Sequence, residues 1–557
     1  MNNTLKIIPI GGLGEVGKNL TVLETSKEII IIDCGISFPD IELLGVDVLI
    51  PDFAYLKKKQ EKIKGLIITH GHEDHVGAVT YLLKEINVPV YGTKLTLGIL
   101  QNKIRERTTA TYDLRTIKAG DTISFSDFFI EFIHVNHSIA DAIALAIKTP
   151  IGTIIHTGDF KIDLPPPQGE VTDLVRFGEY GKAGVRLLMG ESTNAEKKGR
   201  TSSERVVSKK FEKIFEEYKD NRITVATFSS NIYRLQNIIN LSEKYNRKVS
   251  ITGRSMLNIF GTAIELGYIK AKEGTIIPPE AINSLEPNQV TIITTGSQGE
   301  PMSALFRMAF SEHKTIKLNS EDVVVLSSNA IPGNEKLVNN MINKLLELGV
   351  KIIYGSAEEV HASGHGCQDD LAMIHALVKP ELFMPIHGET KQLLAHKNLA
   401  QEMGMDEKNI FVMHNGNVLE LTKKTAKILE QEVKVDPVFV EGYSVVGLTD
   451  NVIRERQLLS NDGVIVVSIG INRKTEKIVN GPELVGRGFA ALGDMPDLIR
   501  GIKSVTKKVA VEGIYDRKDW TDMRNEIKNA VAKYIFRETH KNPLVIPILV
   551  NCPTVRA

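Results

Sequence analysis

Thr69-His70-Gly71-His72-Glu73-Asp74-His75-Val76-Gly77-Ala78 places three imidazoles and two carboxylates within six residues. The β-branched run Lys64–Thr69 directly before the histidines predicts a buried strand, so His70 and His72 fall at its carboxyl end. Such a cluster is typical of a metal site, and a polar loop with coincidental histidines is the alternative. A single tetrahedral zinc does not readily use all of His70, His72, Asp74 and His75, so the spacing predicts two neighbouring cations.

Length and composition place limits on the class of protein. The 557 residues suggest about three domains, and a hydrophobic content of 42% is enough for large cores. Lys+Arg and Asp+Glu are both 68, so a zero net charge gives no global electrostatic reason to expect nucleic acid. The three cysteines (Cys34, Cys367, Cys552) have no ligand-like spacing, which disfavours a disulfide framework. We expect a cytoplasmic globular protein, because no leader and no apolar run of about 18 residues is present.

The N-terminal region predicts three strands, at Leu5–Ile10, Leu20–Glu24 and Glu28–Asp33, which begin an antiparallel sheet. Between the first two strands, Gly12-Leu13-Gly14-Glu15-Val16-Gly17 matches the dinucleotide-binding fingerprint. That motif requires a helix directly afterwards, whereas Asn19–Leu23 has a strand pattern. We therefore reject a dinucleotide site.

Two carboxylates follow predicted buried strands. Asp33 comes directly after four isoleucines, where a buried carboxylate needs a strong donor such as the N–H of a metal-bound imidazole. Asp159 follows the apolar strand that starts at Gly152, in a position to bridge two metals. Each of them, taken alone, is also compatible with an ordinary turn residue.

A further histidine is expected from the alternating run Ile130–His137, which predicts another strand. Either His134 or His137 can face the site from such a strand. His137 is the better candidate because it ends the run, where a loop begins.

The pattern changes from about Arg205, where strand-like runs alternate with helical patterns, as is typical of a parallel α/β unit. The runs are Ile223–Phe228, Lys248–Gly253, Val290–Thr295, Val323–Ser328 and Lys351–Ser356. Glycine-flanked histidines return afterwards in Val360–Gly366 and Phe383–Glu389. We infer that the α/β unit is inserted before the first domain is complete.

The domain boundaries follow from these changes of pattern. The first domain is predicted at residues 1–205 and 357–436, the inserted domain at 206–356, a linker at 437–450 and a C-terminal domain at 451–557. The last region predicts a strand at Gly463–Ile469, a helical region from Met495 to Phe536 and a closing strand at Leu544–Val550. It shows no His/Asp clustering, which favours a role in assembly or substrate guidance.

The order of these motifs resembles a known fold. Asp33, the His70–His75 cluster, His137, Asp159 and His387 occur in the order of the metal motifs of the metallo-β-lactamase fold. The insertion, with Gly190–Thr193 before it and His361–His365 after it, resembles the β-CASP subfamily of nucleic-acid-processing nucleases. The chain is similar to the bacterial ribonuclease J family through Gly11–Asn19, Thr227–Arg234, Thr295–Pro301 and the C-terminal module. The resemblance implies an α/β protein: an αββα sandwich, an inserted β-CASP α/β domain and a small α+β C-terminal domain.

The resemblance also implies how the metals are held. One metal is expected on His70, His72, His137 and bridging Asp159, and the other on Asp74, His75, His387 and the same Asp159. These ligands suit two Zn²⁺ per chain, and Mn²⁺ accepts the same set. Asp33 and Glu191 are carried over as supporting catalytic residues, although many family members have Asp in place of Glu191. The His-x-His-x-Asp-His motif is complete, which favours an active subunit.

The implied activity is that of a metal-dependent ribonuclease with 5′-to-3′ exonuclease and endonuclease action in mRNA decay and RNA maturation, including rRNA processing. The substrate is single-stranded RNA, preferably with a 5′-monophosphate. His365 is expected at the scissile phosphate as electrophile or general acid, with a purely structural histidine as the alternative. Small hydroxyl and backbone N–H donors suit the 5′-phosphate pocket. Ordinary helix capping is the alternative for Ser230 or Asn231. The candidates are Ser229, Ser230, Asn231, His361, Ala362, Ser363, Gly364 and His365.

The resemblance further implies a homodimer or homotetramer, partners in an RNA-degradation complex and no membrane association. Gly45, Asp47 and Glu441 correspond to places where some family members hold Ca²⁺, although relatives carry Asp in place of Glu441. Turns and solvated surfaces contain the same residue types. The competing functions are a β-CASP DNA nuclease and a scaffold subunit of an RNA-degradation complex. The long insertion disfavours a ribonuclease Z or a lactonase.

Overall fold

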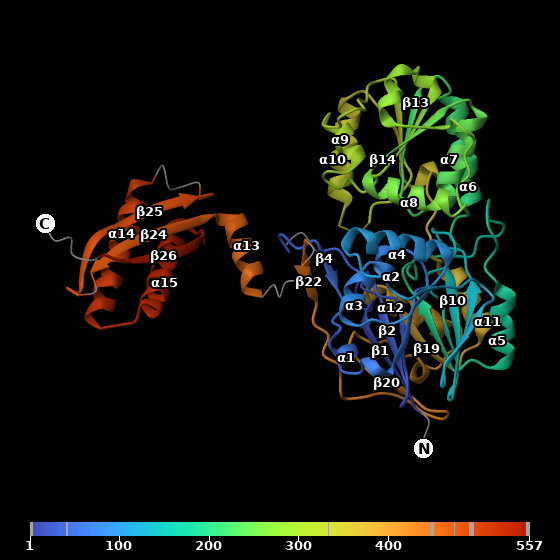
Figure 1. Cartoon of the computed structure of the whole chain (residues 1–557), viewed down its shortest axis with the longest axis horizontal. Coiled ribbons are helices and arrows are strands. Elements are labelled where there is room, and N and C mark those ends of the chain that lie inside the picture. Colours follow the sequence, from blue (N-terminus) through green and yellow to red (C-terminus); the bar gives the residue numbers. More distant parts are fainter. Residues whose placement is uncertain are drawn as a thin grey trace. The chain divides into compact units, whose positions relative to one another are not determined.

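The computed structural model describes residues 4–552 except 40–42, 332, 443, 446–449, 473 and 490–494. The chain divides into two compact units, one of residues 1–38 with 49–438 and one of residues 39–48 with 439–557. Each unit has its own hydrophobic core. The elements of both units are labelled in Figure 1.

Two sheets packed face to face form the first part of the larger unit. The eight-stranded sheet has the order β21 (Ala426–Ile428), β20 (Leu419–Leu421), β1 (Leu5–Gly11), β2 (Leu20–Glu24), β3 (Ile29–Ile32), β5 (Ile63–Ile67), β6 (Val90–Gly92) and β7 (Leu114–Thr116). The six-stranded sheet has the order β19 (Leu382–Ile386), β12 (Leu187–Glu191), β11 (Gly152–His156), β10 (Ile143–Thr149), β9 (Phe129–His134) and β8 (Thr122–Ser124). Side chains from both sheets share one core.

Helices cover the outer faces of this sandwich. A separate apolar cluster joins the six-stranded sheet to α5 (Leu174–Ala183), α11 (Gln368–Val378) and α12 (Thr390–Glu402). The helices beside the eight-stranded sheet are α1 (Ala54–Lys57), α2 (Glu73–Val76), α3 (Val79–Glu85) and α4 (Lys94–Arg107). The expected αββα sandwich is confirmed, and the strand β2 that follows Gly17 supports the rejection of a dinucleotide site.

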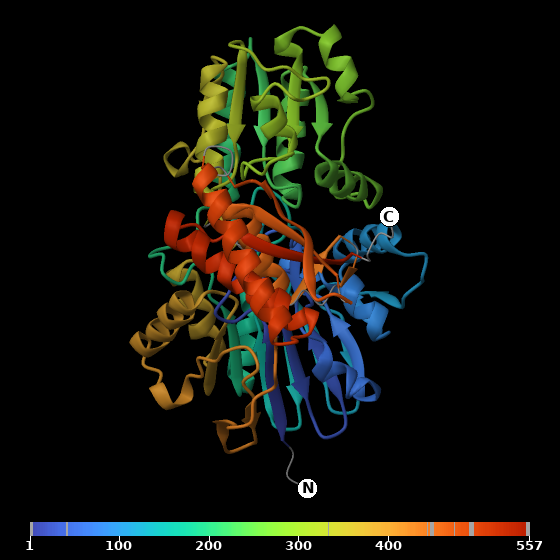
Figure 2. The same cartoon turned by 90° about the vertical axis from the view of Figure 1, so that its left-hand side faces the viewer.

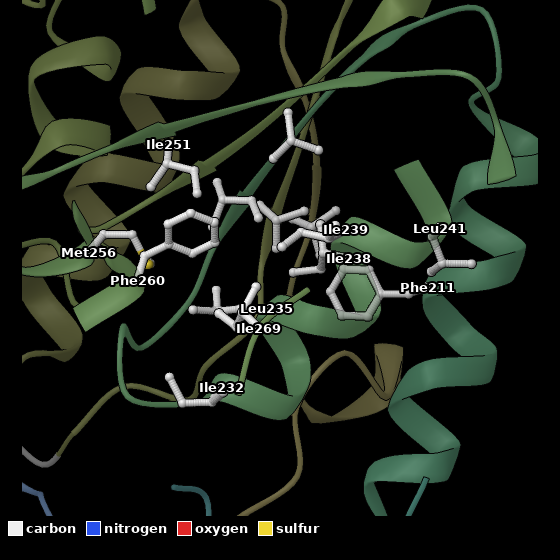
Figure 3. Close-up of a cluster of buried hydrophobic side chains, with 14 of the residues drawn as sticks. Phe211, Ile232, Leu235, Ile238, Ile239, Leu241, Ile251, Met256, Phe260 and Ile269 are labelled. Atoms are coloured by element: carbon white, nitrogen blue, oxygen red, sulfur yellow. The ribbon is translucent and has the colours of Figure 1, made fainter. Parts of the chain in front are cut away.

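The inserted domain is a six-stranded, wholly parallel sheet. Its order is β15 (Ile276–Ile277), β14 (Lys248–Thr252), β16 (Val290–Thr294), β13 (Arg222–Ala226), β17 (Asp322–Leu326) and β18 (Lys351–Ile353). One face packs on α6 (Glu204–Glu217), α7 (Ile232–Lys244) and α8 (Arg254–Glu265), through the cluster drawn in Figure 3. The other face packs on α9 (Ala304–Ala309) and α10 (Glu335–Glu347), as Figure 1 and Figure 2 show. The prediction of a parallel α/β unit is confirmed. Five of its six strands were predicted, and the short β15 was not.

Helix–helix contact and polar contacts fix the inserted domain against the sandwich. Leu95 and Ile99 of α4 belong to the apolar cluster of the inserted domain. Asn102 of α4 donates to the hydroxyl of Thr262 on α8, at 2.6 Å. The inserted domain therefore has a defined position relative to the strands that carry the histidines.

A buried ion network crosses the same seam. The Nζ atom of Lys161 lies 3.5 Å from Asp163 Oδ2 and 3.7 Å from Glu204 Oε1. Arg234, on α7, donates to Glu204 Oε1 at 2.7 Å. All four side chains are buried, so each charge depends on its partners for compensation.

The smaller unit contains a three-stranded sheet in the order β25 (Lys477–Arg487), β24 (Val464–Asn472) and β26 (Leu544–Asn551). The long helices α14 (Pro496–Tyr515) and α15 (Trp520–Thr539) pack on one face of this sheet. Helix α13 (Asp450–Asp462) precedes β24. The expected α+β module is present, and β25 is a strand that the sequence did not predict.

The predicted linker 437–450 lies only partly within the described residues, because 443 and 446–449 fall outside them. A second three-stranded sheet has the order β23 (Ser444–Val445), β22 (Val438–Glu441) and β4 (Val48–Ile50). Short 3₁₀ helices occur at Gln60–Lys62, Pro279–Ser284, Pro287–Gln289, Ser356–Glu358 and Glu407–Asn409. Residues 39–48 group with the C-terminal unit, and the other domain boundaries stay predictions. Within the described part of the chain, no helix is both long enough and apolar enough to cross a membrane.

Candidate metal centre

Strand ends bring the predicted site residues together. His70 and His72 follow β5, Asp159 follows β11 and His387 follows β19, while His137 comes shortly after β9. Asp74 and His75 lie on the single turn of α2. All seven predicted ligands meet at one place, whereas His134 lies outside it and contacts the carbonyl of Glu170 at 3.1 Å.

Three imidazoles form the first group. The Nδ1 atom of His72 lies 3.0 Å from Nε2 of His70 and 3.0 Å from Nε2 of His137. The Nδ1–H of His137 donates to the carbonyl of Gly364 at 2.7 Å, so its Nε2 atom carries a lone pair. His70 has the same tautomer, because the hydroxyl of Thr69 donates to Asp33 and accepts from His70 Nδ1 at 3.1 Å.

The second group joins two imidazoles and two carboxylates. His387 Nε2 lies 3.2 Å from Asp74 Oδ2, and His75 Nε2 lies 3.2 Å from Asp159 Oδ2. The same Asp159 oxygen lies 3.4 Å from His387, 3.8 Å from His70 and 4.0 Å from His137. One carboxylate oxygen therefore lies between the two groups of ligand atoms.

Burial and neighbouring charges control protonation at these groups. Burial lowers the pKa of His70, and it lowers the pKa of His72 to about 4, so both imidazoles are neutral near pH 7. Burial also acts to lower the pKa of His75, but the carboxylates of Asp159, Asp74 and Asp33 outweigh it and raise that pKa. The carboxylates of the second group thus favour positive charge on or beside these imidazoles, which a bound cation can also supply.

The donor set fits divalent metal ions. Buried lone pairs of neutral imidazoles converge in the first group, and carboxylates with imidazoles converge in the second. Such nitrogen and oxygen ligands are those that Zn²⁺ and related ions take in proteins. The chain uses divalent metal, and the assignment of individual ligands belongs to the proposal below.

Side chains behind the ligands fix their orientation. Asp33 accepts the Nδ1–H of His75 at 2.8 Å, which is the imidazole donor that its position after β3 predicts. The hydroxyl of Thr193 lies 2.7 Å from Nδ1 of His387. Thr193 is neither a histidine nor a carboxylate, so its residue type does not mark it as a site residue. The only sequence signal for it is its position directly after Glu191-Ser192.

His365 lies at the edge of the second group. Its Nδ1 atom is 3.3 Å from Glu191 Oε1 and 3.8 Å from Asp159 Oδ2. Burial acts to lower the pKa of His365, but the Glu191 carboxylate outweighs it and raises the pKa to about 9. Glu191, fully buried at the end of β12, thus holds a proton on an imidazole beside the candidate metals.

The predicted substrate residues fall into two segments. Ser230 is part of the turn between β13 and α7, and its Oγ atom lies 3.0 Å from His72 Nε2. Asn231 caps α7 by accepting from the backbone N–H of Arg234 at 3.1 Å. The alternative of helix capping is thus seen for Asn231, and Ser229 lies beside these residues, half-buried.

The second segment, His361 to His365, runs against the ligand histidines. The Nη1 atom of Arg234 lies 3.1 Å from Nδ1 of His361. Because a guanidinium only donates, Nδ1 of His361 is the acceptor. Ala362 is buried in the apolar core, and Ser363 Oγ accepts from Asn194 at 2.9 Å. A Cβ atom on Gly364 would meet the His137 ring at 2.7 Å, so only glycine fits there.

The candidate calcium residues lie together within the smaller unit. Arg456 donates to Glu441 at 2.7 Å and to the carbonyl of Leu44 at 3.1 Å. Asp47 accepts from the backbone N–H of Gly442 at 2.6 Å. The guanidinium of Arg456 therefore already contacts part of the candidate oxygen ligands, a competitor for the cation that could not be expected from the sequence.

Four protein-family models match the chain. They are the metallo-beta-lactamase superfamily over residues 13–195, the beta-CASP domain of ribonuclease J over 220–345, the Zn-dependent metallo-hydrolase RNA specificity domain over 349–413 and the ribonuclease J C-terminal domain over 451–552. Together they follow the domain order seen in the structure.

Whole-chain relatives agree with these matches. The chain is 39% identical to ribonuclease J 1 of Streptococcus pyogenes, covering 99% of this chain and 98% of the relative. It is 38% identical to ribonuclease J of Thermus thermophilus, covering 98% and 95%, and 39% identical to ribonuclease J of Helicobacter pylori, covering 98% and 79%.

Among solved structures, a protein of unknown function from Enterococcus faecalis has a similar fold, with a TM-score of 0.54 and 16% identity over 75% of this chain and 100% of that one. The family assignment rests on the whole-chain relatives, which are 38% to 39% identical over 98% to 99% of this chain. This chain belongs to the ribonuclease J family.

Proposed function

We propose that this metal-dependent ribonuclease degrades single-stranded RNA from a 5′-monophosphate end, cleaves internally as well, and acts in mRNA decay and RNA maturation. The observation that carries the proposal is the position of Asp159 Oδ2, within 4.0 Å of imidazole nitrogens of both ligand groups. Such a shared oxygen suits a dinuclear centre, which is the usual device for in-line displacement at phosphorus.

One ion is proposed to bind to His70, His72, His137 and Asp159, and the other to Asp74, His75, His387 and Asp159. We propose two Zn²⁺, with Mn²⁺ accepted by the same ligands. When bound, such ions lower the pKa of a water molecule and neutralise charge on the phosphodiester. The protein's own part is to hold the ligand rings, which Asp33 and Thr193 do from behind.

His365 is the proposed proton donor to the leaving 3′-oxygen. Its ion pair with Glu191, at 3.3 Å, keeps the ring protonated and limits its rotation. The side chain of His365 is 22% exposed although its neighbours are buried, so it is accessible to a substrate that reaches the ligand groups. Glu191 acts through His365 and is therefore a positioning residue.

The 5′-phosphate is proposed to bind where the turn Ser229–Asn231 meets the segment His361–His365. Ser230 and Gly364 each contact a ligand histidine, which puts this region close to the candidate metals. Hydroxyl and backbone N–H donors of this kind suit phosphate oxygens. The short separation from the metals is what a 5′-to-3′ exonuclease requires.

We further propose a homodimer or homotetramer in the cytoplasm, and partners in an RNA-degradation complex. Support for the oligomer comes from the sheet face of the C-terminal unit that α14 and α15 leave uncovered, which exposes Val485, Ile546, Ile548 and Val550. Exposed apolar patches commonly mark protein–protein contacts. The three cysteines are free, as is usual in a reducing compartment.

One experiment separates the candidate functions. Purified protein is incubated with 5′-labelled and 3′-labelled RNA or DNA of the same sequence, with a 5′-monophosphate or a 5′-triphosphate. We expect progressive release of mononucleotides from monophosphorylated RNA and inactivity of His72→Ala. Equal degradation of DNA would indicate a DNA nuclease, and a His72→Ala variant that keeps its cellular role would indicate a scaffold.

A further inference from the structure

The histidines of the metal centre differ in what holds their outer ring nitrogens. His75 and His387 are held from within the sandwich domain, by Asp33 and Thr193. His72 is held by Ser230 of the inserted domain, with 3.0 Å between Nε2 and Oγ. The two residues are 158 positions apart in the chain.

Only one tautomer of His72 suits this arrangement when a cation is bound. Its Nδ1 atom faces Nε2 of His70 and Nε2 of His137, each at 3.0 Å, and therefore faces the cation. A neutral imidazole with Nδ1 as ligand carries its hydrogen on Nε2. His72 then donates to Ser230 Oγ, and the hydroxyl hydrogen of Ser230 stays available for a phosphate oxygen.

We propose that Ser230 is a positioning residue through which the inserted domain sets the metal affinity of the three-histidine group. This inference rests on the dinuclear centre of the proposed function. A hydrogen bond from the outer nitrogen fixes ring orientation and raises the basicity of the ligand nitrogen, and loss of such a partner typically weakens metal binding about 10- to 100-fold.

The turn that carries Ser230 is itself well held. The backbone N–H of Asn231 donates to the carbonyl of Phe228 at 3.2 Å, and that of Ile232 donates to the carbonyl of Ser230 at 2.9 Å. The side chain of Asn231 caps α7. The position of the Ser230 hydroxyl is therefore determined by where the inserted domain lies on the sandwich.

The same dependence extends to His137, whose Nδ1–H donates to Gly364 in the segment that returns from the inserted domain. Two of the three outer nitrogens in this group are thus held by the insertion or by its return segment. Both outer nitrogens of the second group are held by the sandwich domain. The two ions should therefore respond differently to changes in the inserted domain.

The test measures metal binding without RNA. Metal-free full-length protein is titrated with Zn²⁺ in competition with a chromophoric chelator, for wild type, Ser230→Ala, Ser230→Thr and Ser229→Ala. We expect Ser230→Ala to weaken one of the two sites by about tenfold or more and to leave the other unchanged. Ser230→Thr keeps the hydroxyl and should restore binding, and the neighbouring Ser229→Ala should bind as wild type does.

The outcomes discriminate between the claims. Wild-type affinity at both sites in Ser230→Ala, or equal weakening of both sites, would overturn this inference while the dinuclear centre stands. Wild-type protein that takes up no divalent ion would refute the dinuclear centre together with the inference. Circular dichroism of each variant confirms the fold, and Ser230→Thr excludes a general packing defect as the cause.

Discussion

The Nδ1 atom of His75 lies 2.8 Å from Oδ2 of Asp33, so this imidazole donates outward and turns Nε2 toward Asp74 and Asp159. The backbone of Asp33 is left-handed, with φ of 60°, a conformation that asparagine tolerates better than alanine does. The pair therefore allows a clean test by Asp33→Asn, which removes the charge without adding backbone strain.

We expect Asp33→Asn to lower the affinity for one ion by roughly 10- to 100-fold, because the ligand ring loses its charged partner. Competition titration measures the effect. Asp141→Asn is the matched control, since Asp141 has a similar φ of 63° but contacts Tyr268 instead. Unchanged affinity in Asp33→Asn would show that this pair does not support the metal.

Asp159→Ala should abolish RNA hydrolysis and leave the fold largely intact. The side chain is buried at a strand end and serves both ligand groups, so its loss affects both ions at once. Elemental analysis should find two divalent ions per wild-type chain. The exposed Asp220→Ala is the control for hydrolysis, and a wild type that retains one ion or none would count against a dinuclear centre.

Acid should destabilise the fold partly through His375 of α11, where burial lowers the pKa from 6.5 to about 4. The unfolded chain binds this proton below about pH 6.5, while the folded chain binds it only near pH 4, so stability falls as pH drops across that window. The full effect is roughly 3 kcal/mol.

His375→Leu should therefore flatten the pH dependence of stability between pH 6.5 and 4. Urea unfolding at several pH values, with wild type measured in parallel, isolates the contribution of this residue from that of the metal centre. The same substitution at exposed His414 is the control. An identical slope in His375→Leu and wild type would contradict the prediction.

Ile548→Lys should convert an oligomer into monomers with reduced activity, because Ile548 is 44% exposed on the uncovered face of β26. Light scattering measures the mass. Val511→Lys is the control, since Val511 is also exposed in this unit but lies on α14. Removal of the chain after Thr449, a residue outside the described part, should have the same effect as Ile548→Lys, and an unchanged mass in both would refute the proposed interface.

The calcium hypothesis can be tested through Arg456. Because its guanidinium contacts Glu441 and the Leu44 carbonyl, we expect wild-type melting to depend little on calcium. Arg456→Gln should lower the melting temperature, and calcium should restore it through Asp47 and Glu441. If calcium instead stabilises wild type, and Asp47→Ala removes that effect, the cation binds beside the arginine.

The clustering of the candidate ligands could be predicted because histidine and aspartate are uncommon at the ends of apolar strands, so His70, Asp159 and His387 stand out. Ser230 was assigned to substrate, and its contact with His72 could not be foreseen. Serine is frequent in turns, and the contact depends on how a separate domain lies on the sandwich. Thr193 was missed because a threonine after a strand is as ordinary as a serine in a turn, although its contact with His387 lies within the sandwich domain.

The parallel strands of the inserted domain could be predicted because buried β-branched runs recur between helical patterns. Strand β25 was missed because Gly481-Pro482 interrupts it, and proline usually argues against a strand. The sheet order β25-β24-β26 explains why Pro482 is tolerated. Because β25 is an edge strand, the missing backbone N–H of the proline costs little.

The ion network of Lys161, Asp163, Glu204 and Arg234 restricts how this chain can be recombined with others. Two positive and two negative side chains are buried together, and only Arg234 comes from well inside the insertion. A chimaera that replaces residues 206–356 with a segment lacking a guanidinium at that place leaves an uncompensated carboxylate, at a cost of about 3–5 kcal/mol. The inserted domain thus cannot be exchanged freely between related chains. Any chimaera has to take the residues at positions 204 and 234 from the same parent.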